Sequence, residues 1–212
     1  ALRSIFFIIF PATVGLIVLR MPIVKLLFER GEFDAASTLR TAFVLLGYTI
    51  GLFAYSGQKI IVTGFYSLKD TKTPMKVGVL TLLLNIGLNF LLIGPLKEGG
   101  LALATSLAGI FNFFLLMVLF QRRMGEFPWR EVASSSVRIL AASLLTGLVS
   151  WAVYQGIDAL IGGPETLRLL ASVFGSIGIS VLIYLVLCFL FRVAEVREAF
   201  AWIRSRRGEE LL

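Results

Sequence analysis

The chain has 212 residues, of which 58% are hydrophobic and 16% are charged, and its net charge is +7. A soluble domain carries about 25% charged residues, so this composition, with a mean hydropathy of +0.90, excludes an ordinary water-soluble domain and favours a membrane protein. There is no histidine and a single cysteine, Cys188, which excludes a histidine-based catalytic or metal centre and an internal disulfide in this chain.

Six long apolar segments are predicted to cross the bilayer, because a spanning helix needs about 20 largely apolar residues. They are Ser4–Leu19, Thr38–Tyr66, Pro74–Ile93, Leu101–Phe120, Val137–Ile157 and Leu167–Phe191. The predicted fold is therefore an all-α polytopic membrane protein with six transmembrane helices. Pro11 is expected to kink the first crossing, Pro22–Arg30 to form a short amphipathic stretch at the membrane surface, and Asp34 to cap the second helix.

Composition also divides the chain into four parts. Residues 1–121 hold four crossings, residues 122–132 form a linker with Gly125 and Pro128, and residues 133–193 hold two additional crossings. Residues 194–212 are predicted to be an amphipathic tail in the cytoplasmic headgroup layer. Because the first residue is alanine and no signal-like segment precedes the first crossing, we expect Ala1 to lie inside a longer protein.

The basic residues predict the orientation of these crossings. Of the 20 Lys and Arg residues, Lys59 lies within a crossing, six fall on one side of the membrane and the other thirteen on the opposite side. The six are Arg20, Lys25, Arg30, Arg40, Lys97 and Arg168. The positive-inside rule then places the loop at Lys69–Lys72 and both ends of the chain in the cytoplasm. This topology explains the net positive charge better than nucleic-acid binding does.

Charged groups within the crossings are scarce. None of the 13 acidic residues falls inside a predicted crossing, which counts against a self-contained membrane enzyme with acid–base chemistry. Lys59 lies about 10 Å from Tyr66 at the cytoplasmic end of its helix. It is either a cation in a water-filled cavity, meeting an anionic group such as a pyrophosphate, or a lysine that snorkels to the headgroups. Its neighbour Gln58 favours a polar cavity, and both interpretations stay open.

A second polar group lies in the third and fourth crossings. Asn85 and Asn89 share one helical face because they are four residues apart. A hairpin at Gly94–Gly100 makes the two crossings antiparallel, so Asn89 and Thr105 are expected at matching depth, and Asn112 belongs to the same constellation.

These groups allow two interpretations. The side chains of Asn85, Asn89 and Thr105, together with the backbone carbonyl near Leu101, offer oxygen ligands that suit a small hard cation such as sodium. The alternative is an amide–hydroxyl clasp between helices. Spacing alone favours the clasp, because a cation without a carboxylate ligand in the chain is poorly compensated.

Several motifs occur in a recognisable order. They are Glu29-Arg30-Gly31-Glu32-Phe33, Phe65-Tyr66-Ser67 followed by Asp70-Thr71-Lys72-Thr73-Pro74, Asn85-Ile86-Gly87-Leu88-Asn89, and Gly100-Leu101-Ala102-Leu103-Ala104-Thr105-Ser106. Together they resemble the MurJ/MviN-type lipid II flippases of the MOP/MATE-like exporter superfamily. The likeness is clear over residues 1–121 and mostly hydropathic over residues 133–212.

The resemblance implies that the chain supplies helices nine to fourteen of a fourteen-helix flippase in the bacterial inner membrane. Such a protein exports the undecaprenyl-pyrophosphate-linked peptidoglycan precursor by alternating access, with no covalent chemistry, and needs the missing N-terminal helices and membrane lipids as partners. Alternatives are an O-antigen or polysaccharide flippase or a multidrug exporter of the same superfamily, and a membrane glycosyltransferase or ligase. The outer loops are short and poor in the acidic, His or Arg groups that an enzyme would need.

The resemblance also bears on the candidate sites. Asn85, Asn89, Leu101 and Thr105 stand at the positions of the family's sodium site, although relatives can carry Asp where this chain has Asn89. No other cofactor is expected. The resemblance further implies a groove for the polyprenyl tail, bordered by aromatic residues of the last two helices. These are Trp151, Tyr154, Phe174 and Tyr184, which the sequence alone would assign as interface anchors.

Overall fold

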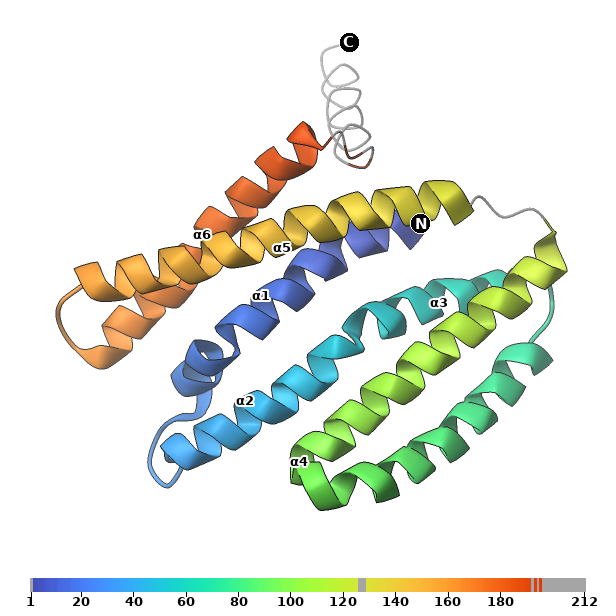
Figure 1. Cartoon of the computed structure of the whole chain (residues 1–212), viewed down its shortest axis with the longest axis horizontal. Helices are drawn as coiled ribbons and strands as arrows, with labels where there is room; N and C mark the ends of the chain where they lie inside the picture. Colours follow the sequence, from blue (N-terminus) through green and yellow to red (C-terminus); the bar gives the residue numbers. More distant parts are fainter. Residues whose placement is uncertain (1, 126–128, 192, 194, 196–212) are drawn as a thin grey trace, which may run out of the picture.

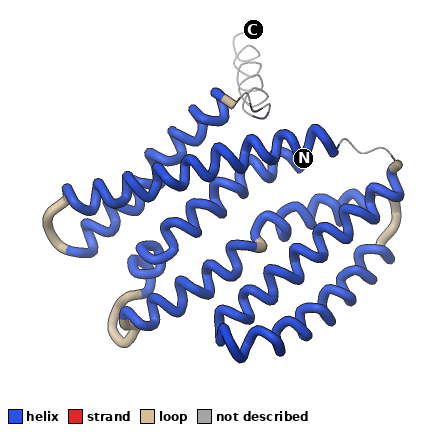
Figure 2. The backbone as a smooth tube through the Cα atoms, in the orientation of Figure 1, coloured by secondary structure: helices blue, strands red, loops and turns tan. Residues whose placement is uncertain are grey.

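The computed structural model describes residues 2–125, 129–191, 193 and 195. Most of these residues lie in helices. They are α1 (Leu2–Phe28), α2 (Ala35–Ile50), α3 (Leu52–Ser67), α4 (Lys72–Met124), α5 (Trp129–Leu160) and α6 (Glu165–Leu190). No strand occurs in the described part of the chain, so the predicted all-α fold is confirmed (Figures 1 and 2). Apart from Glu195, the predicted tail at 194–212 lies outside the described residues.

Five helical stretches are long and apolar enough to cross a membrane, with α2 and α3 counted as one stretch of 33 residues. The longest, α4, has 53 residues and is interrupted at Lys97, whose φ of 49° and ψ of −130° are not helical. The chain reverses there, and the two arms of α4 run antiparallel (Figure 1). They correspond to the third and fourth predicted crossings, so the five stretches can make six crossings.

Helix α1 differs from the prediction at its end. It continues through Pro11 and Pro22 to Phe28, so residues 22–28 belong to the first helix and are not a separate stretch. A proline removes only one backbone hydrogen bond, and membrane helices tolerate it where neighbouring groups compensate. The cap on α2 is as predicted, because Asp34 Oδ1 accepts a hydrogen bond from the Ser37 N–H at 2.8 Å. This bond lowers the pKa of Asp34 below its usual value.

The linker predicted at 122–132 is shorter in the structure, because both of its ends are helical. Helix α4 runs to Met124, and α5 begins at Trp129. Arg122 and Arg123 stand in the last turn of α4, where positive charge favours helix, and Glu131 stands in the first turn of α5, where negative charge does so.

Helices α2 and α3 follow one another end to end and meet at Gly51 (Figure 1). The buried Ser106 hydroxyl, on the second arm of α4, donates to the Gly47 carbonyl at 2.6 Å and accepts from the Gly51 N–H at 3.1 Å. A methyl group at Gly47 would come within 2.8 Å of the Ala102 Cβ. Small residues therefore bring α2 and α3 close to α4, as expected for helices that pack in a membrane.

We predict that Gly51→Ala lowers stability by roughly 1–3 kcal/mol, a typical cost of overpacking. An added Cβ would lie 2.6 Å from Ser106 Oγ and 2.8 Å from Ser106 Cα, so the backbone of α4 would have to move. Thermal unfolding of the purified protein in detergent, followed by circular dichroism, measures the change. Gly87→Ala is the matched control, because a Cβ there meets no atom within 4 Å. Equal midpoints for the two variants would contradict the packing account.

Helices α5 and α6 pack on one another and on α1. A core cluster that includes Ile139, Tyr184 and Cys188 lies between them. The Tyr184 hydroxyl donates to the Phe7 carbonyl of α1 at 2.7 Å. At the end of the bundle that carries the start of α1, Glu195 is 7% exposed. It accepts from Arg3 Nε at 2.7 Å and from the Ser135 hydroxyl at 3.0 Å.

We predict that Glu195→Gln destabilises the protein at neutral pH by roughly 1–3 kcal/mol, since it weakens charge-assisted hydrogen bonds. Burial by itself would raise the pKa of Glu195, but hydrogen bonds from Arg3 and Ser135 and the positive charge of Arg3 hold that pKa below its usual value. A lowered pKa stabilises the fold above the unfolded pKa of about 4.3, and this contribution disappears as pH falls through the folded pKa. Melting curves of both proteins between pH 7 and pH 3 should therefore converge at the acid end. A constant difference would contradict this role for the charge.

Candidate functional site

One polar contact joins the two arms of the α4 hairpin. The Asn112 amide donates to the Thr81 hydroxyl at 2.7 Å. Thr81 stands 16 residues before Lys97, and Asn112 stands 15 residues after it, so this bond fixes the register of the arms. Asn89 and Thr105 each stand eight residues from Lys97 and therefore lie at matching depth.

The four proposed cation ligands form two local pairs. Asn89 Nδ2 donates to Asn85 Oδ1 at 3.1 Å, and the Thr105 hydroxyl donates to the Leu101 carbonyl at 2.8 Å. Within the described part of the chain, no hydrogen bond joins the two pairs. The clasp that does join the arms uses Asn112 and Thr81.

Among the four proposed ligands, one amide oxygen is open, and Asn112 Oδ1 near the clasp also lacks a partner among the described residues. Asn89 Oδ1 is buried and has no hydrogen-bond partner among the described residues. A buried acceptor without a partner costs about 1–3 kcal/mol, so its position calls for a donor, a water or a cation. No group of three or more His, Cys, Asp or Glu that could hold a metal is found in the described part of the chain. The proposed cation ligands of this chain are all neutral oxygens.

Lys59 and Gln58 lie on α3. The helix buries Ala54, Gly57 and Ile61, and Lys59 is exposed on the opposite side of the helix. In the part of the chain that is described, Lys59 has no carboxylate partner: the ion pairs involve other residues. Its backbone carbonyl accepts from the Thr63 hydroxyl at 2.9 Å. The ammonium is thus available to an anion, and both interpretations of Lys59 remain compatible with its position.

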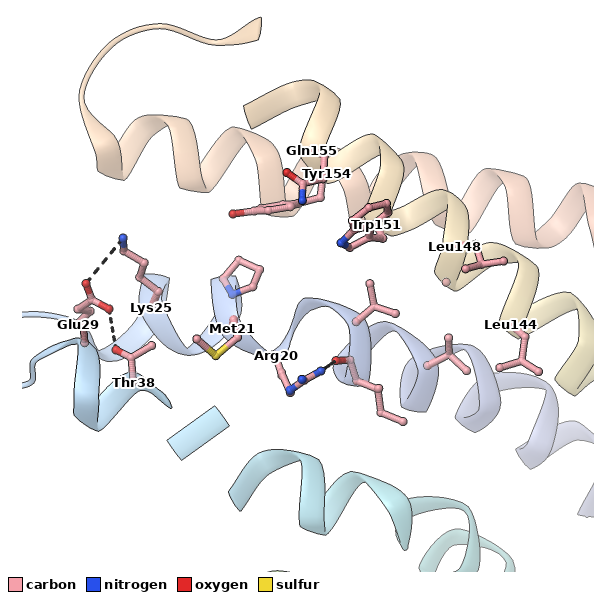
Figure 3. Close-up of a pocket in the computed structure, with 16 residues that line it drawn as sticks. Arg20, Met21, Lys25, Glu29, Thr38, Leu144, Leu148, Trp151, Tyr154 and Gln155 are labelled. Atoms are coloured by element: carbon pink, nitrogen blue, oxygen red, sulfur yellow. Dashed lines mark hydrogen bonds and ion pairs between the residues drawn. The ribbon is translucent and has the colours of Figure 1, made fainter. Parts of the chain in front are cut away.

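The aromatic residues of α5 and α6 border two different cavities. Trp151 and Tyr154 line a cavity of about 890 Å³ between α1, the start of α2 and α5, which we call the polar-mouthed cavity (Figure 3). Tyr184 lines a second cavity of about 590 Å³ between α1, α5 and α6, which we call the apolar cavity. Phe174 is 64% exposed on α6.

Sequence reasoning missed three residues that position these groups. Thr81 is the partner of Asn112, Ser106 joins α4 to the break at Gly51, and Tyr55 donates to the Thr105 carbonyl at 2.7 Å. Single hydroxyl groups are common in apolar helices, so their type gives little signal. The close spacing of Thr105 and Ser106 after a run of small residues was the only available sign.

The sequence is similar to proteins of one known family. The family model described as "Lipid II flippase MurJ" matches residues 1–162. The chain belongs to the MurJ family. It is 34% identical over 199 residues to a probable lipid II flippase MurJ of Rhizobium tropici, covering 92% of this chain and 37% of that protein. A lipid II flippase MurJ of Thermosipho africanus is 35% identical over 167 residues, which cover 76% of this chain and 34% of that protein.

A solved structure agrees with these relatives. A lipid II flippase MurJ in an inward closed conformation matches with a TM-score of 0.71 and 29% identity, over 90% of this chain and 38% of that chain. The predicted resemblance and fold class are confirmed. This chain spans about a third of the length of the relatives it matches and corresponds to their C-terminal portion.

Proposed function

We propose that the protein to which this chain belongs translocates lipid II, the undecaprenyl-pyrophosphate-linked peptidoglycan precursor, across the bacterial inner membrane by alternating access. The observation that carries the proposal is the family match over residues 1–162, together with a shared helical arrangement at a TM-score of 0.71. The protein would serve cell wall synthesis as a transporter, with no covalent step. Its cavity would be completed by helices outside this chain.

The orientation is part of the proposal. Both ends of the chain, the α3–α4 loop and the α4–α5 connection would face the cytoplasm, because they carry most of the basic residues. Asp70 orders the α3–α4 loop, since its carboxylate accepts from the Thr73 N–H at 3.1 Å and from the Thr73 hydroxyl at 2.8 Å. These bonds lower the pKa of Asp70. The Asp-Thr-Lys-Thr-Pro motif is thus a rigid turn at the start of α4.

Lys59, with Gln58 beside it, would contact the substrate's pyrophosphate. Its support is an exposed ammonium on the face of α3 opposite the α4 contact, about 12 Å from the end of that helix. A lysine in a water-filled cavity attracts phosphate as a compact charge.

We predict that Lys59→Ala lowers lipid II transport in reconstituted vesicles about tenfold without lowering protein abundance, as expected for loss of one charge-assisted contact. The measurement uses the full-length protein and the fraction of labelled lipid II that becomes accessible at the opposite leaflet. Lys76→Ala removes an exposed lysine of α4 and serves as the matched control. Unchanged transport in Lys59→Ala would show that this lysine snorkels to the headgroups and does not contact the substrate. The flippase function itself is tested separately, by the transport rate of the wild type.

The hairpin polar group would bind sodium through Asn85, Asn89, Leu101 and Thr105. The open Asn89 Oδ1 and the matching depth of Asn89 and Thr105 support this proposal. The Asn89–Asn85 hydrogen bond would be exchanged for ion contacts, and a carboxylate from outside this chain would supply the missing charge.

We predict that sodium raises the thermal midpoint of the full-length protein by about 3 °C, because a ligand that binds only the folded state stabilises it. Asn85→Ala should abolish this shift by removing one ligand. Potassium chloride at equal ionic strength is the control for screening. A shift that potassium reproduces, or that persists in Asn85→Ala, would leave the interarm clasp as the role of these residues.

The polyprenyl tail would lie in the apolar cavity that Tyr184 lines, next to the exposed side of α6 that carries Phe174. The wall of this cavity is formed by side chains such as Pro11, Leu16 and Ile177. Because the surrounding lipid is as apolar as the tail, binding would depend on close van der Waals contact between the tail and this wall. Trp151 and Tyr154 line the polar-mouthed cavity instead, and Phe174 lines neither cavity.

A further inference from the structure

The polar-mouthed cavity has a definite place in the packing of α1 and α5. The two helices are in tight contact where Gly147 meets Val14, since a Cβ at Gly147 would overlap a Val14 methyl group. From that point the cavity opens toward the end of α1 and the start of α2 (Figure 3). It therefore fills the space between two helices that diverge after their contact.

The lining changes character along this cavity. Near the contact it is apolar, with Val14, Val18 and Leu144. Near the mouth it is polar, with Arg20 and Lys25. Val14 and Lys25 are eleven residues apart, which is about 16 Å along a helix. A cavity that is polar at a helix end and apolar toward the helix middle matches a lipid headgroup followed by its acyl chain.

The charges at the mouth are not equally paired. Lys25 is neutralised by Glu165 at 2.5 Å and by Glu29 at 3.8 Å, and Glu29 also accepts from the Thr38 hydroxyl at 2.7 Å. Arg20 has no carboxylate partner within the described part of the chain; its Nη1 donates to the Ile17 carbonyl at 2.5 Å. A guanidinium has five N–H donors in a planar fork, so most of this fork remains open to an anion. Phosphate oxygens fit such a fork in a bidentate manner.

The residues around the cavity indicate which kind of molecule would supply this phosphate. Leu148 and Trp151 line the cavity and are 68% and 56% exposed, so the cavity is continuous with an exposed apolar surface of this chain. Trp151 and Tyr154 are amphipathic residues of the kind that lie at headgroup level. An apolar surface with such an aromatic border is typical of contact with a bilayer, which holds phospholipid at high local concentration.

We propose that the polar-mouthed cavity binds an anionic phospholipid of the adjacent leaflet, with its phosphate on Arg20 and an acyl chain along Val14, Val18 and Leu144. In the orientation proposed above this is the outer leaflet. The site goes beyond substrate transport and stands whether or not the protein flips lipid II. The lipid would fill the gap between α1 and α5 and stabilise the position of α5 against α1.

The test measures lipid binding to the full-length protein by native mass spectrometry in detergent. Phosphatidylglycerol and phosphatidylcholine with the same acyl chains are the probes. We expect the wild type to prefer phosphatidylglycerol about fivefold, the contribution of one basic residue near a membrane surface. Arg20→Gln should bring this preference close to one. Arg40→Gln, which removes an arginine that does not line the cavity, should retain it. Loss of preference in both variants, or in neither, overturns the proposal.

A second variant tests the apolar part without changing charge. Leu148→Trp places a larger side chain against the cavity, and the site is exposed enough to accept it without disturbing the core. It should weaken both phospholipids and leave the preference for phosphatidylglycerol unchanged. Unaltered binding of both lipids would show that the acyl chain lies elsewhere and would overturn the proposal even if Arg20→Gln failed to fold.

Two further probes distinguish other occupants. Glycerol phosphate carries the phosphate without acyl chains and should not compete with phosphatidylglycerol at equal concentration. Effective competition would indicate a site for free phosphate and overturn the lipid assignment. Lipid II should not displace phosphatidylglycerol in an Arg20-dependent manner, and such displacement would assign the cavity to the transport substrate instead.

Discussion

Hydrocarbon offers no hydrogen bonds, so every backbone N–H and C=O group inside the membrane needs a partner from the protein, and this constraint governs the structure. Regular helix satisfies it along most of the chain. The interesting points are the few places where helix stops. At Gly51, between α2 and α3, the Ser106 hydroxyl accepts from one backbone group and donates to another. At Lys97 the chain reverses at the end of the hairpin, where Glu98 is also exposed.

The same constraint explains what the sequence could predict. Long apolar runs must be helices, so hydropathy located the crossings closely, including the two arms of α4. Asp34 was recognisable as a cap because an Asx residue before a helix has a local role. The continuation of α1 through Pro22 was not predictable in this way. The cost of a helical proline depends on which neighbours compensate for the lost bond, and neighbours are a tertiary property.

The sequence predicted the depth of the site residues along their helices but not the contacts that they make. Counting from Lys97 gave the common level of Asn89 and Thr105, because the rise per residue is fixed. It could not give the rotation of each arm about its axis, and that rotation pairs Asn112 with Thr81. A similar limit applies to Trp151 and Tyr184. Both are aromatic residues of the last two helices, yet they line different cavities because α1 packs between those cavities.

Helix α1 is joined to α5, α6 and the residue Glu195 that follows them by contacts at three points. Arg3 binds Glu195 at one end, Phe7 accepts from Tyr184 nearby, and Lys25 binds Glu165 at the other end. Charge pairs at both ends with a hydrogen bond between them hold three helices as one unit. In the alternating access proposed above, a motion that preserves these contacts would carry α5 and α6 with α1, and the apolar cavity, which these three helices line, would keep its walls. Lipids bound there would travel with the unit, which distinguishes them from a substrate that has to change sides.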